Sequence, residues 1–330
     1  MRAKLSKILI TGGAGFIGSA LVRQAVKKGY RVVVVDKLTY AGDLRRLGEV
    51  GRKIRLYRTD IGNLKQMQLI CKKEKPAVIV NCAAETHVDR SIRDARSFID
   101  ANIKGVQVLL DLVRQFPVRR LVQISTDEVY GDIARGSFTE ESPLKASSPY
   151  AASKAAADLL VQSYVRTHGS PVIIVRPCNN YGPWQYPEKL LPRAILRVLR
   201  GENIPVYGKG LNVREWLYVD DCAAGILFLM SRGRNGEVYN LGSGVESRNV
   251  DTVRMLLRAL GISDTMFEFV KDRPGHDIRY SLNCHKIRRQ FKWKPKVTLP
   301  EGLALTVNWC LHNQEWLLSK WEEVSRLYNE

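Results

Sequence analysis

The chain has 330 residues, of which 45% are hydrophobic and 26% are charged, and its formal net charge is +19. This length is enough for one large two-lobed unit or for two domains with a sizeable core, and the composition is typical of a globular protein. The longest apolar stretches are too short to span a bilayer, and the charged start of the chain leads into a short apolar run and a glycine-rich turn. We therefore expect a cytoplasmic protein that makes no membrane contact.

The excess of basic residues raises the question of a nucleic-acid partner. The 52 Lys and Arg residues are scattered along the sequence, often in pairs such as Lys27-Lys28, Lys72-Lys73 and Arg119-Arg120. Scattered pairs are typical of solvated helix faces, so we expect no specific nucleic acid as a partner. A basic surface also attracts small anionic substrates, which fits a sugar nucleotide.

The cysteines give no sign of a metal site. They contain no Cys-x-x-Cys pair, so core thiols in a reducing compartment explain them best, and we expect no metal. The six are Cys71, Cys82, Cys178, Cys222, Cys284 and Cys310.

The first half of the chain alternates short Val- and Ile-rich runs with helix-like segments. The runs are not strictly alternating, which is typical of strands that are buried on both faces. The expected strands are Lys7–Thr11, Arg31–Asp36, Ile54–Arg58, Ala77–Asn81, Arg120–Ser125 and Pro171–Arg176, and the expected helices lie near residues 16–28, 64–74, 94–115 and 149–168. This alternation predicts an α/β fold built on a Rossmann-type doubly wound parallel sheet with right-handed crossovers.

The pattern changes after Arg176, where prolines punctuate a loop-rich stretch. We expect residues 1–178 to form a nucleotide-binding domain and residues 179–330 to form mainly a smaller C-terminal α/β substrate-binding lobe. A helix-like stretch and a strand-like stretch within residues 217–243 are expected to return to the first domain. Ligands of open α/β sheets bind at the carboxyl ends of the strands, so the second lobe should cap that edge.

The first strand runs directly into Gly12-Gly-Ala-Gly15-Phe-Ile-Gly18 and an apolar helical pattern. In a dinucleotide fingerprint the first glycine permits the tight turn, the second lets the backbone approach a pyrophosphate, and the third lets the helix pack closely on the strand. Asp36 ends the second strand roughly twenty residues later, where a carboxylate accepts from the ribose hydroxyls and repels a 2′-phosphate. The cofactor should therefore be NAD rather than NADP, with Asp60 a candidate contact for its adenine.

Tyr150 and Lys154 are spaced to share one face of a helix that Pro149 begins. A free tyrosine has a pKa near ~10 and is a poor base at neutral pH. A nearby ammonium and the positive nicotinamide ring would favour its phenolate, so that it could remove a proton from a sugar hydroxyl.

The tripeptide Thr126-Asp127-Glu128 follows an apolar run and supplies a hydroxyl and two carboxyls. Neighbouring carboxyls tend to share one proton, which suits an acid and a base in one reaction step. In a continuous strand Asp127 would point away from the other two side chains. The chain must therefore leave strand conformation by about Asp127 if all three are to reach one sugar.

Together these motifs resemble the extended short-chain dehydrogenase/reductase family, or NAD-dependent epimerase/dehydratase family, over nearly the whole chain. Within that family they are closest to the nucleotide-sugar 4,6-dehydratases, because related epimerases and decarboxylases lack the Asp-Glu pair. The segments that carry the closer match are Asp36–Gly42, Ala83–Ser91, Ser125–Gly131, Asn179–Pro183, Pro187–Leu190 and Asp272–Asp277.

The resemblance implies a lyase that oxidises C4 of dTDP-glucose, eliminates water across C5 and C6 and returns the hydride to C6, with NAD tightly bound and regenerated. The implied catalytic residues are Thr126, Asp127, Glu128, Tyr150 and Lys154. A 4,6-dehydratase for UDP-glucose or another nucleotide hexose, or an epimerase or decarboxylase, stays open as an alternative. A homodimer through the helices near 94–115 and 149–168 is also implied.

The resemblance further implies two sets of binding residues. The cofactor set is Gly12, Gly15, Phe16, Ile17, Gly18, Asp36, Lys37, Leu38, Thr39, Asp60, Ile61, Cys82, Ala83, Ala84, Tyr150, Lys154 and Asn180. The set for the nucleotide-diphosphate sugar is Thr86, Thr126, Asn179, Lys189, Leu190, Pro205, Tyr207, Arg214, Asn249, Arg273 and His276, in which Arg214 and Arg273 occupy phosphate-contact positions.

Overall fold

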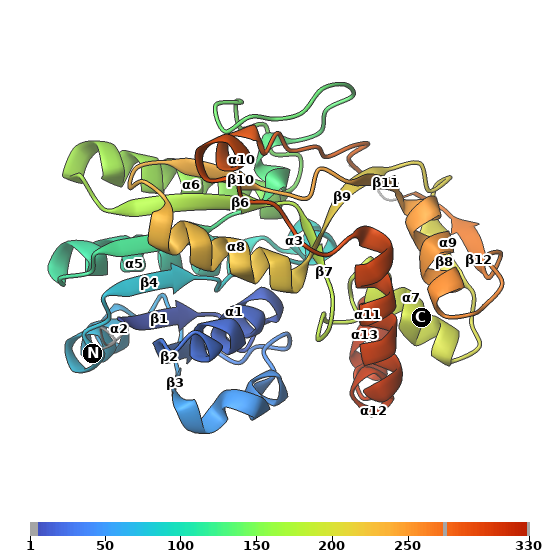
Figure 1. Ribbon diagram of the computed structural model, residues 1–330, viewed down its shortest axis with the longest axis horizontal. Helices are drawn as coiled ribbons and strands as arrows, with labels where there is room; N and C mark the ends of the chain where they lie inside the picture. The colour runs from blue at the N-terminus through green and yellow to red at the C-terminus, as the bar shows by residue number, and fades with distance from the viewer. Residues whose placement is uncertain (1–5, 273–275, 329–330) are drawn as a thin grey trace.

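A seven-stranded, wholly parallel sheet in the order β10-β6-β5-β4-β1-β2-β3 dominates the structure (Figure 1). The structure is a computed structural model, and it describes residues 6–272 and 276–328. The expected fold class is confirmed. The strands are β1 (Lys7–Thr11), β2 (Arg31–Asp36), β3 (Ile54–Arg58), β4 (Val78–Asn81), β5 (Arg120–Ile124), β6 (Val172–Pro177) and β10 (Val238–Leu241).

Helices cover both faces of this sheet, which explains why its strands lack strict alternation. Ile8 and Ile10 of β1 belong to one hydrophobic core, and Leu9 between them belongs to the core on the opposite face. The first core packs under α1 (Phe16–Lys27) and α8 (Val219–Arg232). The second packs under α2 (Leu64–Glu74), α5 (Gly105–Gln115) and α6 (Pro149–His168).

The second lobe has two small sheets and its own hydrophobic core, and it lies beyond the carboxyl ends of the main strands (Figure 1). Its division from the first domain at residue 178 stays a prediction. Its strands are β7 (Asn179–Tyr181), β8 (Ile204–Tyr207), β9 (Val213–Tyr218), β11 (Glu246–Arg248) and β12 (Phe267–Val270). The helices after β6, apart from α8, are α7 (Leu190–Leu199), α9 (Asn249–Ala259), α10 (His285–Phe291), α11 (Leu299–His312), α12 (Gln314–Leu318) and α13 (Trp321–Tyr328).

The helix expected near 94–115 is broken into several pieces. Two short helices, α3 (Val88–Arg93) and α4 (Arg96–Phe98), precede a π-helical turn, η2 (Ile99–Lys104), and only then does α5 begin. The buried side chain of Asn102 lies in the π-helical turn and bonds both backbone groups of Glu85 and the hydroxyl of Ser153. A π-helical turn is wider than a regular helix, and such turns often occur at functional sites. Here the turn carries Asn102, whose bonds to Glu85 fix the loop after β4.

The turn between β1 and α1 depends on the absence of side chains at two glycines. Gly12 has a φ of +64°, and a Cβ on it would lie 2.6 Å from the backbone nitrogen of Ala83. A Cβ on Gly18 would lie 2.1 Å from the carbonyl oxygen of Gly12. The expected roles of these glycines in turning the chain and in packing helix on strand match this geometry.

Replacing Gly18 with alanine is therefore expected to lower the free energy of unfolding by about 3 kcal/mol, because the new methyl group overlaps backbone that cannot yield. Urea titration of the purified variant measures this loss. The matched control is Gly48→Ala, where a Cβ meets nothing within 4 Å and the change should stay within about 0.5 kcal/mol. Equal stability of the two variants would contradict the packing role of Gly18.

Candidate active site

Three adjoining pockets follow the carboxyl edge of the main sheet and continue into the second lobe. The first is lined by the Gly-rich turn and the loops after β2, β3 and β4. The second shares Gly12 and Gly15 with it and reaches the end of β5 and Tyr150. The third lies between α7, β8 and β9 and shares Glu128 and Lys189 with the second. A dinucleotide and a second nucleotide could thus meet at the end of β5.

Strand β5 ends at Ile124, and a 3-10 helix, η3 (Asp127–Tyr130), follows after two residues. Thr126 is the extended residue before this helix, and its hydroxyl accepts from the backbone N–H of Glu128 at 3.3 Å. The expected departure from strand conformation near Asp127 is confirmed. As a result Thr126, Asp127 and Glu128 all line the pocket that Tyr150 lines.

Asp127 is 2% exposed and lies close to two other carboxyls. Burial, together with Glu128 and Glu215, raises the pKa of Asp127 well above its usual range. Its Oδ1 accepts from the Thr126 hydroxyl at 3.2 Å, whereas its Oδ2 is buried without a hydrogen-bond partner. A carboxyl in this environment holds its proton to a higher pH than an exposed aspartate does, which suits a proton donor.

Tyr150 is the second residue of helix α6, which begins at Pro149 and is capped at its N-terminus by the Ser148 hydroxyl. Burial and the nearby Glu128 raise the pKa of Tyr150, and the neighbouring Thr126 side chain only partly offsets this rise. The protein's own groups therefore favour the neutral phenol, contrary to our expectation that a neighbouring ammonium would favour the phenolate. The positive nicotinamide ring becomes the main source of charge that could lower this pKa.

Lys154 lies one helical turn beyond Tyr150 and is 3% exposed. Its Nζ donates to the carbonyl oxygen of Ile124 at 2.7 Å, and burial lowers its pKa to about 8. Lys154 does not line the pocket but fixes α6 to the end of β5. Its predicted contact with the cofactor stays a prediction.

The first pocket has the features that a dinucleotide requires. Gly15 is the N-cap residue of α1 and offers no side-chain cap, so the first backbone N–H groups of the helix remain available to a pyrophosphate. Asp36 accepts from the backbone N–H groups of Ala14 and Leu38, each at 2.8 Å, and each carboxylate oxygen keeps a further acceptor site for a ribose hydroxyl. These residues fit NAD.

The other predicted cofactor residues mostly line the first two pockets. Lys37 and Asp60 form an ion pair of 2.7 Å at the rim, and the Oδ1 atom of Asn180 is buried without a partner. Leu38 is absent from the lining and instead turns the loop with a φ of +57°. The predicted residues that do line these pockets are Gly12, Gly15, Phe16, Ile17, Gly18, Asp36, Lys37, Thr39, Asp60, Ile61, Cys82, Ala83, Ala84, Tyr150 and Asn180.

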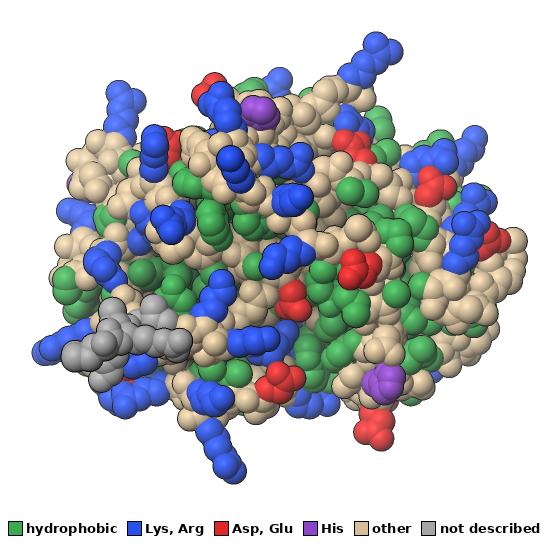
Figure 2. Space-filling model, in the orientation of Figure 1, with side chains coloured by type: hydrophobic (Ala, Val, Ile, Leu, Met, Phe, Trp, Pro, Cys, Tyr) green, Lys and Arg blue, Asp and Glu red, His purple; other side chains and the backbone are tan. Residues whose placement is uncertain are grey.

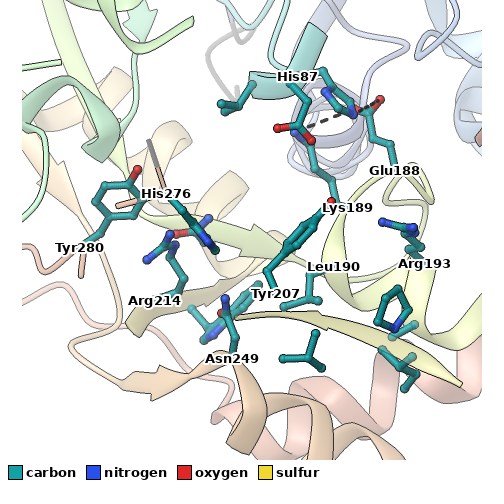
Figure 3. Close-up of a pocket in the computed structure, with 18 of the residues that line it drawn as sticks. His87, Glu188, Lys189, Leu190, Arg193, Tyr207, Arg214, Asn249, His276 and Tyr280 are labelled. Atoms are coloured by element: carbon teal, nitrogen blue, oxygen red, sulfur yellow. Dashed lines mark ion pairs between the residues drawn. The ribbon is translucent and has the colours of Figure 1, made fainter. Parts of the chain in front are cut away.

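The third pocket brings together most of the predicted substrate residues. Figure 3 shows Arg214, His276 and Tyr280 on one side of it, and Leu190 and Arg193 on the other. The predicted residues in its lining are Asn179, Lys189, Leu190, Pro205, Tyr207, Arg214, Asn249 and His276. Thr86 lines the neighbouring second pocket. Arg273 lies outside the described residues.

Polar groups in this pocket are held ready for a ligand. Arg214 is fixed by bonds to the carbonyl oxygens of Val213 and Asp277 at 2.8 and 3.0 Å, and its guanidinium stacks over Tyr280. The Oδ1 atoms of Asn179 and Asn249 are buried without a hydrogen-bond partner. A fixed cation and two unsatisfied acceptors suit a ligand that carries phosphates and hydroxyl or N–H donors.

Sequence reasoning missed Arg46, which lines the second pocket and is 1% exposed. Its guanidinium donates to the carbonyl oxygens of Ala14 at 2.9 Å and of Trp184 at 2.9 and 3.1 Å, and also to that of Ala41. Burial lowers the pKa of Arg46 to about 10. It thus joins the Gly-rich turn, the loop after β2 and the second lobe, and no sequence motif pointed to it.

A second set of residues that the sequence did not reveal stabilises the end of β5. Asp158 of α6 is fully buried, accepts from the Ser125 hydroxyl at 2.9 Å and pairs with Arg176 of β6 at 2.8 Å. Arg176 also donates to the hydroxyl of Tyr130 at the end of η3. The turn that carries Thr126 and its neighbours is therefore anchored to both adjacent elements.

The model of the NAD dependent epimerase/dehydratase family matches residues 8–242. The chain belongs to this family. The match covers the Gly-rich turn, the end of β5, Tyr150 and Lys154, so the expected family membership is confirmed.

Close relatives within the epimerase/dehydratase family extend the match to nearly the full length. A dTDP-glucose 4,6-dehydratase of Streptomyces niveus is 45% identical over 326 residues, with 96% of this chain and 95% of the relative covered. The low-salt glycan biosynthesis protein Agl12 of Haloferax volcanii is 47% identical over 311 residues, with 93% and 99% covered. The crystal structure of DesIV, a dTDP-glucose 4,6-dehydratase from Streptomyces venezuelae with NAD and TYD bound, has a TM-score of 0.91 at 45% identity and covers 94% of this chain and 98% of that one.

Residues 6–272 and 276–328 contain no group of three or more His, Cys, Asp or Glu side chains that could hold a metal ion. No helix in that part of the chain is long and apolar enough to cross a membrane.

Replacing Arg46 with methionine should lower the free energy of unfolding by about 3 kcal/mol, because buried carbonyl oxygens in three segments lose their charged donor. Urea titration measures the loss. The control is Arg45→Met, since Arg45 is half exposed and pairs with Asp43 at the surface, and it should cost less than about 1 kcal/mol. A stable Arg46→Met variant would show that these bonds do not hold the segments together.

The raised pKa of Asp127 has a consequence for stability. When pH rises above the usual range of an aspartate, the unfolded chain ionises and the folded carboxyl does not, so stability falls until the folded pKa is passed. Asp127→Asn removes this effect and should melt at a higher temperature than the wild type near pH 7, with the difference shrinking toward pH 4. Melting curves across that range would contradict the buried acid if the difference were constant.

Proposed function

We propose that the protein is a dTDP-glucose 4,6-dehydratase that uses NAD and forms dTDP-4-keto-6-deoxyglucose. The observation that carries the proposal is the position of Asp127, a buried carboxyl beside Glu128, Thr126 and Tyr150 in one pocket. An epimerase or a decarboxylase needs the tyrosine but has no step in which this acid is required. The names of the close relatives point the same way.

Tyr150 and Thr126 are the residues that assist the oxidation at C4. Tyr150 accepts the proton of the C4 hydroxyl, and the hydroxyl of Thr126, which lines the same pocket, aligns the sugar oxygen. Bound NAD supplies the acceptor for the C4 hydride and the donor for its return to C6. Lys154 holds the tyrosine-bearing helix against the end of β5.

The carboxyls of Asp127 and Glu128 catalyse the elimination of water. A ketone at C4 acidifies the hydrogen at C5, which Glu128 removes as general base and gives back to C5 when the hydride returns to C6. Asp127 donates its proton to the C6 hydroxyl, which leaves as water, and a carboxyl with a raised pKa is suited to this role. The two side chains come from one turn, so the base and the acid are held in fixed relation to each other.

The nucleotide of the substrate belongs in the third pocket. Arg214 is the cation fixed there for the diphosphate, and Asn249, Tyr207 and Leu190 offer polar and apolar contacts to the sugar nucleotide. Arg273 keeps its predicted phosphate role. A UDP sugar remains the second candidate, because the pocket shows no group that separates thymine from uracil.

The assembly and location belong to the same proposal. Ile99 in the π-helical turn and Leu159 of α6 are 44% and 56% exposed, which supports a homodimer through these helices. The reaction uses a soluble nucleotide sugar, which fits a cytoplasmic enzyme.

The purified protein should convert dTDP-glucose to a 4-keto-6-deoxy product without net consumption of NAD. The product is detected by its absorbance in alkali, and a parallel incubation with UDP-glucose ranks the two bases by kcat/KM. Formation of the C4 epimer without a 4-keto product would defeat the proposal in favour of an epimerase.

Asp127→Asn should slow water loss by about 10²-fold or more, because a general acid contributes rate factors of about this size. C4 oxidation should fall far less, so NADH should accumulate in a single turnover, where its absorbance is measured. The control is Tyr150→Phe, which should abolish formation of NADH. If Asp127→Asn instead lost NADH formation alone, Asp127 would not be the acid.

A further inference from the structure

The positive charge of the chain is concentrated at the amino edge of the main sheet. All seven strands are parallel, so the segments that lead into them lie at one edge, opposite the active site. These segments, with Lys7 at the start of β1, hold sixteen Lys and Arg and only two acidic residues. They are residues 27–31, 52–55, 72–77, 114–120, 166–171 and 232–237. The basic pairs that looked scattered in the sequence are thus gathered by the topology.

The opposite edge of the same sheet has the reverse charge. The segments that follow the strands at the active-site edge hold nine acidic and four basic residues, in residues 37–43, 59–63, 82–87, 125–148 and 178–189. The high net charge therefore does not surround the first domain's part of the active site. The expectation that this charge serves to attract the anionic substrate explains little of it.

A cleft lies within this amino edge. It is lined by the starts of β1, β2 and β3, and it contains Tyr30, Arg31, Arg52 and Lys53. The one acid in its lining, Glu74, is fully buried and already bonded to Lys7 at 2.8 Å, to Arg55 at 2.9 Å and to Tyr57. Arg31, Arg52 and Lys53 are exposed and have no acidic partner in the described part of the chain. The cleft thus presents three uncompensated cations.

Helix stability accounts for only part of this arrangement. Lys27, Lys72 and Lys73 lie in last turns of helices, where a cation interacts favourably with the helix dipole. Arg31 begins a strand, and Arg119 lies in a loop before one, so neither gains from a helix end. Like charges crowded at one edge repel one another, which makes an anionic partner the natural counterpart.

We propose that the amino edge binds single-stranded nucleic acid without sequence preference, with its phosphodiester backbone in the cleft of Arg31, Arg52 and Lys53. The half-buried Tyr30 also lines this cleft, and a basic groove with an aromatic side chain is the usual combination in such sites. The cations extend across the sheet, whose six interstrand spacings of about 4.8 Å give a stripe of roughly 29 Å. In Figure 2, Lys and Arg side chains project from all sides of the molecule, including the side where the strands begin.

An anionic membrane is the weaker candidate for the same surface. Membrane-binding faces add exposed apolar or aromatic side chains that enter the headgroup layer. None of the exposed large hydrophobic residues lies in the basic segments, all of which the structure describes. The charges are also set around a cleft rather than on one flat helix face.

Fluorescence anisotropy with a labelled oligodeoxycytidylate of about 12 nucleotides tests the proposal on the full chain. The triple variant Arg31→Gln, Arg52→Gln, Lys53→Gln should weaken binding about tenfold or more at low salt. It should also reduce the slope of log K against log salt by about 2, since each lost phosphate contact removes about 0.7. Dehydration activity should not change, because the cleft lies at the far edge of the sheet.

The matched control is Arg254→Gln, Lys294→Gln, Lys296→Gln, which removes the same charge from exposed positions elsewhere. It should weaken binding less than about twofold. Equal weakening by the two variants, competition by NAD or dTDP-glucose, or no binding by the wild type would overturn the proposal. Binding to phosphatidylserine vesicles without binding to the oligonucleotide would assign the surface to a membrane instead.

Discussion

The end of β5 at Ile124 is the constraint on which the active site depends. If strand conformation continued through Glu128, the Asp127 side chain would point to the face of the sheet opposite Thr126 and Glu128. Because the chain turns into a 3-10 helix instead, the three side chains share one pocket. The same turn buries Asp127 beside other carboxyls, so one local change of backbone conformation determines both the position of the acid and its protonation.

That turn is not stable by itself, and hydrogen bonds from the surrounding structure hold it in place. Short 3-10 helices have weak internal hydrogen bonds. Here Ser125 before the turn is bonded to Asp158, and Tyr130 at its end is bonded to Arg176, while Arg176 and Asp158 pair with each other. Residues from α6 and β6 therefore hold both ends of the turn. The pair is buried, and removing one partner would leave an uncompensated charge next to the catalytic groups.

The sequence predicted most of what depends on local pattern. The six expected strands of the first half agree with the observed ones to within one residue at each end, since Val- and Ile-rich runs bounded by turns are a strong signal. Asp127 was correctly expected to leave the strand because chemistry required it, not because any propensity indicated it. The short strands of the second lobe, three to six residues long, were missed because they are defined by pairing across long sequence distances.

What could not be predicted has a common physical origin. Arg46 is an ordinary basic residue in sequence, and only tertiary structure places its guanidinium beside the carbonyl oxygens of Ala14 and Trp184, which are distant along the chain. In the π-helical turn, the Asn102 side chain likewise forms hydrogen bonds with Glu85 and Ser153, which are far from it along the chain. The gathering of scattered cations at one sheet edge is also a property of strand direction. In each case the sequence shows the residue, but it does not show which residues the fold brings into contact with it.

The contacts between the lobes bear on how the cofactor could be retained. Arg46 bonds Trp184 of the second lobe, and three residues before it Asp43 accepts from the indole N–H of Trp316 at 2.8 Å. Both contacts start from the segment that follows the cofactor loop, so that loop cannot move away without breaking its bonds to the second lobe. An enzyme that oxidises and then reduces the same substrate must keep its cofactor throughout the cycle. A cofactor loop that is bonded to the substrate-binding lobe meets this requirement. The cofactor pocket then cannot open unless the contacts to the substrate-binding lobe break.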